Sequence, residues 1–154
     1  MLLFVVGLAV GEVAARAERI RGLLAADRHE LRRVHRIAEL AANGEGAEDL
    51  ILSVTAELMG LLKLKDCYFE WAPFIASLPT IEPSGYVERH EWRWTGEGFE
   101  LPSSGVQVPV VSGGKTVGRF VLVPTPGVGV RPEARMIAVA LADQVGVVVS
   151  KRAA

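Results

Sequence analysis

The sequence predicts an α+β fold in which an antiparallel sheet is flanked by N-terminal helices and by one C-terminal helix. Apolar residues recur at helical spacing before residue 62 and after residue 132, whereas the region between them alternates with period two and carries hairpin turns. Strands and helices do not alternate along the chain, which argues against a parallel nucleotide-binding sheet. The 154 residues have room for one domain, placed at 43–154, behind a helical segment at 1–42.

A heptad ladder runs along residues 1–42, because apolar residues recur in steps of three and four. Eleven of its twelve positions are apolar, and they are Leu3, Val6, Val10, Val13, Ala17, Ile20, Leu24, Leu31, Val34, Ala38 and Ala41. A 3.5-residue repeat predicts a helix that lies along a partner helix. We therefore expect a homodimer whose interface contains Val13, Ile20, Leu24, Asp27, Leu31 and Val34. Asp27, the charged member, either loosens or registers this interface, or marks where the helix turns away from it.

Residues 1–11 are almost entirely apolar, but a helix that spans a bilayer needs about 20 such residues. Two interpretations stay open. The segment is the end of a transmembrane helix that starts upstream, or it is an apolar helix buried in an oligomer interface. Arginines follow the segment, so the positive-inside rule places the domain in the cytoplasm, at the inner face of the membrane if it is tethered.

Turn residues separate the next three elements. Asn43 to Gly46 ends the first helix, since asparagine and glycine adopt the left-handed conformation that stops a helix. A second helix is predicted over 47–62. Residues 65–72 alternate as a strand with Cys67, Phe69 and Trp71 on one side. The prolines of residues 73–85 then predict a loop.

The second half of the sheet is predicted from alternation and glycine turns. Residues 86–95 form a strand, and a turn at 96–98 lets residues 99–101 pair back. Residues 106–111 and 115–123 form a hairpin around Ser112-Gly113-Gly114. Pro109 indicates that the backbone of the first of these strands either faces away from a partner at this position or lies at a sheet edge. After a loop at 124–132, Pro132 opens a final helix that runs to residue 151.

Composition excludes several classes of function. A net charge of -1 gives no global argument for nucleic-acid binding. The single cysteine, Cys67, excludes an internal disulfide, and its aromatic strand predicts a buried, inert thiol. The three histidines have no metal-ligand spacing. No catalytic triad, carboxylate pair or Gly-rich nucleotide motif is recognisable, so we expect no enzyme, cofactor or metal site.

One strand concentrates candidate ligand-binding residues. With period two, Glu88, His90, Trp92 and Trp94 share a face, and Trp71 comes from the preceding strand. One interpretation is a pocket wall, in which tryptophans stack on a planar ligand that His90 or Glu88 orients. The other is a partly exposed strand whose tryptophans pack under the loops.

Three stretches of this chain resemble the GAF sensor family. They are the helix and strand EDLILSVTAELMGLLKLKDCYFEW, the hairpin GVQVPVVSGGKTVGRFVLVP and the closing helix RMIAVALADQVGVVVS. The hairpin motif lies at Val106 to Leu122 and the helix motif at Ala138 to Gly146, within a resemblance that covers about residues 30–150. The family's ligand-binding members carry a long insertion over the sheet, whereas only about fourteen residues separate Trp71 from Tyr86 here.

The resemblance implies a non-enzymatic regulatory domain that dimerises and relays conformational change through its helices. The apolar-to-arginine transition near the N-terminus resembles the junction after the membrane domain of potassium-sensing-type histidine kinases, which implies a membrane-domain or kinase partner. The alternative is a ligand-sensing module whose small molecule lies between the sheet and loop 73–85.

Overall fold

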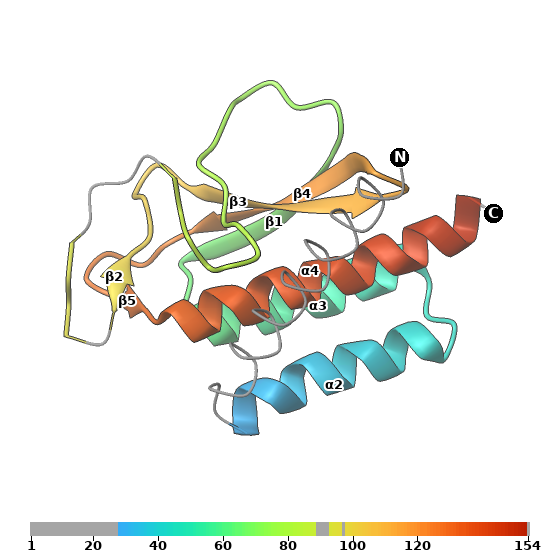
Figure 1. Cartoon of the computed structure of the whole chain (residues 1–154), viewed down its shortest axis with the longest axis horizontal. Coiled ribbons are helices and arrows are strands. Elements are labelled where there is room, and N and C mark those ends of the chain that lie inside the picture. Colours follow the sequence, from blue (N-terminus) through green and yellow to red (C-terminus); the bar gives the residue numbers. More distant parts are fainter. Residues whose placement is uncertain (1–27, 89–92, 97, 154) are drawn as a thin grey trace, which may run out of the picture.

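The computed structural model describes residues 28–88, 93–96 and 98–153 and confirms an α+β fold (Figure 1). In chain order the elements are α2 (Arg28–Ala42), α3 (Ala47–Leu62), β1 (Asp66–Trp71), β2 (Phe99–Glu100), β3 (Val106–Ser112), β4 (Lys115–Val123), β5 (Gly129–Val130) and α4 (Pro132–Ala153). One antiparallel sheet has the strand order β1-β4-β3, and a small second sheet pairs β2 with β5.

The elements stack in three layers, with the helices on one face of the larger sheet (Figure 1). α4 packs on β3 and α3 packs on β1, so these two helices form the middle layer. α2 packs on both of them and forms the outer layer. The sheet presents cross-strand pairs such as Val108–Phe120 and Val106–Leu122, all fully buried, to this helical face. The sheet and helices therefore share one core.

α4 is buried on more than one side. Ile137, Leu141 and Val145 are fully buried, as the sequence predicts for the apolar face of the closing helix. Ala138, Val139, Ala140 and Ala142 are buried as well, so the buried surface extends around the helix. A helix with apolar residues on more than one side needs cover on more than one side. Its place between the sheet and α2 provides this cover.

The β3–β4 hairpin matches the sequence prediction. Gly113 and Gly114 have φ of 58° and 78°, the left-handed values that a two-residue hairpin turn requires. β3 lies at the edge of its sheet, as Pro109 predicts. Gln107 lies two residues before Pro109, and its N–H group points away from β4. It donates to the carbonyl oxygen of Pro79 at 2.8 Å.

The connection after β1 holds this edge. We call residues 72–88 the strap. Its Ile81 N–H donates to the carbonyl oxygen of Gln107 at 3.0 Å, and Thr80 forms a parallel bridge with the same residue. The strap then reaches α4, where the Nε of Arg135 donates to the carbonyl oxygen of Gly85 at 2.5 Å. The strap thus connects the sheet edge to the first turn of α4.

The strand predicted over residues 86–95 is wrong for the part that the structure describes. Val87 forms an isolated bridge with Ile81, because Glu82 and Tyr86 close a tight turn that folds this segment back on the strap. Trp94 forms a single bridge with Phe99, which agrees with the predicted pairing of residues 99–101. Residues 89–92 lie outside the described residues. β5 was not predicted, because two residues in a glycine- and proline-rich loop give no periodic signal.

The described part of the heptad ladder packs within the chain. Leu31 and Val34 are half-buried against the chain's own core, and Ala41 is buried. Ile37, which lies off the ladder, is buried as well. The predicted interface positions Val13, Ile20, Leu24 and Asp27 lie outside the described residues, and so does the helix predicted before residue 28. Dimerisation through the ladder stays a prediction.

The close approach of α4 to β3 yields a test at Gly146. A methyl group at this position meets the carbonyl oxygen of Val111, a backbone atom that cannot rotate away. We expect Gly146→Ala to lower the free energy of unfolding by about 2 kcal/mol in urea titrations.

The matched control is Gly60→Ala in α3, whose added methyl group meets only the end of the Arg33 side chain, at 3.1 Å. The free energy of unfolding of this variant should stay within about 1 kcal/mol of the wild-type value. The flexible Arg33 side chain can move to relieve the contact, and alanine favours the helix more than glycine does. Equal losses in the two variants contradict this packing.

Candidate functional site

A buried arginine organises the sheet face that lies opposite the helices. Phe120 points to the helical core, so its neighbour Arg119 points to the other face. The Arg119 side chain is only 4% exposed. Its Nε and Nη2 atoms donate to Oε2 of Glu70 at 3.0 and 2.9 Å. Nη1 donates to Oε1 of Gln107 at 3.0 Å and to the carbonyl oxygen of Ala76 at 2.8 Å.

These contacts bind the strap to the three strands. The Arg119 guanidinium also lies 4.3 Å from the ring centroid of Phe74, a strap residue. Gln107 extends the network through a 2.8 Å hydrogen bond from Nε2 to the Thr80 hydroxyl. We call Glu70, Phe74, Ala76, Thr80, Gln107 and Arg119 the arginine cluster. A buried cation is tolerated when a carboxylate and further acceptors satisfy it, and the cluster does so.

The cluster lies where the sequence suggested a ligand between the sheet and loop 73–85. The chain's own Arg119 and Phe74 fill this position, and Ala76 accepts a hydrogen bond there. Any ligand at this position must displace one of these groups or the Glu70 carboxylate, which is 39% exposed.

The described members of the proposed ligand wall do not form one surface. Trp71 lies in β1 opposite Gly118 of β4, is 50% exposed and contacts Phe69 edge to face at 4.9 Å. Trp94, 61% exposed, contacts Phe99 next to the small sheet, which Figure 1 places at the far end from the β3–β4 hairpin. Glu88 is exposed, and His90 and Trp92 lie outside the described residues.

Trp71 instead lines a shallow apolar groove between α3 and the outer edge of β1. Leu52 and Tyr68 are its other exposed apolar residues, and the groove has a volume of about 460 Å³. Cys67 lies at its floor and is buried. Burial, with a smaller contribution from the charge of Asp66, raises the pKa of the Cys67 thiol to about 12, so the thiol is protonated at neutral pH.

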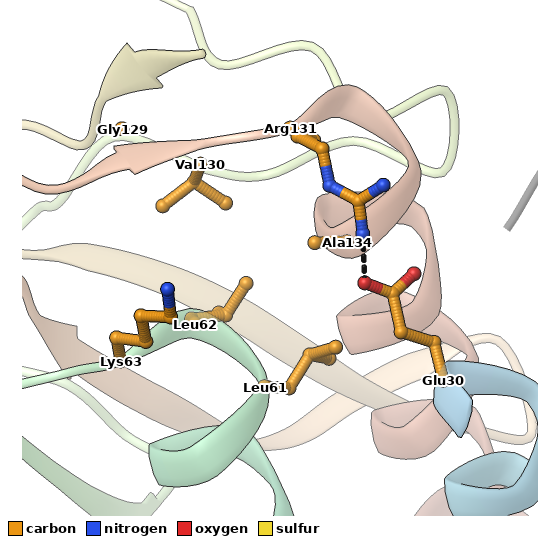
Figure 2. Close-up of a pocket in the computed structure, with 8 residues that line it drawn as sticks. All are labelled: Glu30, Leu61, Leu62, Lys63, Gly129, Val130, Arg131 and Ala134. Carbon is orange, nitrogen blue, oxygen red and sulfur yellow. Dashed lines mark hydrogen bonds and ion pairs between the residues drawn. The ribbon is translucent and has the colours of Figure 1, made fainter. Parts of the chain in front are cut away.

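A second pocket, polar in character, opens where α2, α3 and α4 meet (Figure 2). Its volume is about 200 Å³, and its lining residues are Glu30, Leu61, Leu62, Lys63, Gly129, Val130, Arg131 and Ala134. Lys63 ends α3 in the left-handed conformation, with φ of 50°. Figure 2 shows Arg131 above Glu30, with the Lys63 amine across the pocket from both.

One ion pair links α2 to the start of α4 in this pocket. Nη2 of Arg131 donates to Oε1 of Glu30. The Glu30 side chain is 12% exposed, whereas that of Arg131 is 45% exposed. The second carboxylate oxygen of Glu30, Oε2, is buried without a hydrogen-bond partner. A carboxylate satisfied at only one of its two oxygens is a poorly compensated buried charge.

Sequence reasoning missed both the arginine cluster and this pocket. Arg119 did leave a signal, because it is the single charged residue of the apolar run Val117–Val123 and therefore needs a buried partner. The Glu30–Arg131 pair left none, because its members are 101 residues apart.

Comparison with known proteins identifies no relative: no family model, curated protein or solved structure matches this chain. The GAF resemblance and the function that it implies therefore stay predictions. No helix among residues 28–88, 93–96 and 98–153 has the length and apolar character needed to cross a membrane. Within the same residues, no group of three or more His, Cys, Asp or Glu side chains is placed to hold a metal ion.

The arginine cluster gives a second test. Arg119→Met removes the cation but leaves Glu70, Gln107 and the Ala76 carbonyl without their donor, so we expect a loss of about 2 kcal/mol in the free energy of unfolding. The amide of Ile81, which bonds to the neighbouring edge of β3, should exchange faster with solvent hydrogen.

Lys115→Met, at the exposed start of β4, is the matched control and should change neither quantity. Unfolding by urea and amide exchange measure the two effects. If the Ile81 amide of Arg119→Met exchanges at the wild-type rate, the position of the strap does not depend on the arginine cluster.

Proposed function

We propose that this chain is a non-enzymatic, GAF-type regulatory domain of a signal-transduction protein, in which the sheet and strap bias the position of the N-terminal helix. The observation that carries the proposal is a continuous set of contacts from the strap, through α4, to α2.

The first step joins the strap to α4. Arg135 is buried, and its guanidinium donates both to the carbonyl oxygen of Gly85 and, at 3.0 Å, to that of Val130. Burial lowers the pKa of Arg135, and the nearby Glu133 charge partly opposes this effect. Gly85 itself has φ of 85° and approaches the backbone of Pro132 closely, so the strap cannot shift here without moving α4.

The second step joins the middle layer to α2. Ile37 and Ala41 are buried in the shared core, while two ion pairs fix the polar side of α2 to α3. Arg33 and Arg36 both bind Glu57, at 2.6 and 2.8 Å. A helix that is packed on one side and ion-paired on another has a defined position, which a change in α4 would alter.

The third step is the partner of α2. We propose that the heptad ladder upstream of residue 28 pairs with the same helix of a second copy, in the cytoplasm, and passes the altered position to a membrane domain or kinase. Two packings of a paired helix are a suitable bistable element, because a small difference in contact energy selects one of them.

A ligand-sensing module is the second candidate function. The arginine cluster favours it, because a buried guanidinium under a strap can exchange Glu70 for the acid group of a ligand. A thermal-shift screen with nucleotides and metabolites distinguishes the two functions. A saturable shift that Trp92→Ala or His90→Ala abolishes would favour ligand sensing.

Self-association tests the relay directly. We expect the full chain to be a dimer in light scattering at high micromolar concentration. Ile20→Asp should make it monomeric, because it adds a second charge to a seam that already carries Asp27. Arg19→Asp, one residue off the ladder, is the matched control and should stay dimeric. A monomeric wild-type chain with the whole ladder present would contradict the relay.

A further inference from the structure

The pocket of Figure 2 combines features that suit a small anion. Two cations, Lys63 and Arg131, line it on its solvent side, and Lys63 has no ion-pair partner among the described residues. Ala134, in the first turn of the 22-residue helix α4, lines it as well. The N-terminus of a helix carries unpaired N–H groups and a partial positive charge, which favour an anion.

The chain already places one carboxylate in this environment. Glu30 reaches in from α2 and binds Arg131 through Oε1, while its Oε2 is buried without a partner. Two cations and one carboxylate leave the pocket with a formal charge of +1. Glu30 therefore compensates the pocket incompletely and is itself incompletely satisfied.

We propose that this pocket binds a small anion, a carboxylate or a phosphate, which competes with Glu30 for Arg131 and thereby weakens the docking of α2. The anion enters past the exposed Lys63 and accepts hydrogen bonds from Lys63 and Arg131. A cation is disfavoured, because it would meet the two positive side chains before the single buried carboxylate.

The direction of the coupling follows from burial. When an anion takes Arg131, Glu30 is left as an unpaired charge that is 12% exposed, and the repulsion between the two anions adds to this cost. The first turns of α2 relieve it by moving away from α4. By linkage, any change that pulls α2 away raises the affinity of the pocket for the anion. The consequence for signalling rests on the proposed function, whereas the binding itself does not.

Calorimetric titration of the full chain with inorganic phosphate, and separately with acetate, tests the site. We expect saturable binding in the millimolar range that Arg131→Gln abolishes and Lys63→Gln weakens several-fold. Glu30→Gln keeps the shape of the competitor but removes its charge, so it should bind the anion about tenfold more tightly than wild type. Lys115→Gln removes a distant exposed cation and should bind as wild type does.

The comparison of the two anions identifies the ligand class, since a phosphate site would prefer phosphate and a carboxylate site acetate. Binding that is equal in wild type, Arg131→Gln and Lys115→Gln would show non-specific charge attraction and overturn the proposal. Unchanged or weaker binding in Glu30→Gln would overturn the competition, whatever the affinity. Arg131→Gln removes the ion pair between the start of α4 and α2, so circular dichroism must first show that this variant is folded. Glu30→Gln is an independent test, because its expected effect is a gain in affinity.

Amide exchange tests the effect on α2. Saturating phosphate should speed backbone amide exchange at residues 32–36 in the wild type. It should not change the exchange rates in Glu30→Gln, because the glutamine side chain carries no charge that would be left unpaired. Binding without faster exchange would overturn the release of α2. A monomeric protein that still binds phosphate in an Arg131-dependent manner would contradict the proposed relay function but confirm the site.

Discussion

The two-sided burial of α4 constrains the position of the other elements. One side of this helix lies on β3, where Gly146 lets the helix approach the Val111 carbonyl, and the other side lies under α2. Removing this much apolar surface from water is the dominant favourable term for a domain of this size. Neither the sheet nor α2 can cover its apolar face without α4, so the three layers depend on one another.

Polar contacts are concentrated where the layers end and not within the core. The arginine cluster closes the outer face of the sheet, Arg135 joins the strap to α4, and the pocket of Figure 2 lies at the junction of the helices. Each of these sites connects segments that are distant in sequence. A ligand at any of them would change a contact between layers, which is why we interpret the domain as regulatory. In the pocket, one oxygen of the Glu30 carboxylate has no hydrogen-bond partner, and this contact is the one at which we propose ligand exchange.

Much of the fold follows from local patterns. The bounds of α3 and β4 agree with the sequence prediction because apolar periodicity, prolines and glycine turns mark them directly. The segment after residue 86 was predicted wrongly. Its alternation suggested a strand, whereas the pairing of Val87 with Ile81 folds it onto the strap.

The candidate sites were the least predictable part. Arg119 was missed although it is a charge in an apolar strand, and its partners Glu70 and Gln107 follow only from strand order. Glu30 and Arg131 meet only because α2 packs on α4, a tertiary contact that no local pattern encodes.

Native-state hydrogen exchange under increasing urea tests most directly whether α2 belongs to the same cooperative unit as the sheet domain. The amides of Ile37 and Ala41 in α2 would be compared with those of Leu141 and Val145 in α4. The account predicts that all four open with the same free energy and the same dependence on urea, because packing and ion pairs hold α2 on the middle layer. If the α2 amides open at much lower free energy, independently of urea, α2 is an autonomous helix and cannot report the state of the sheet.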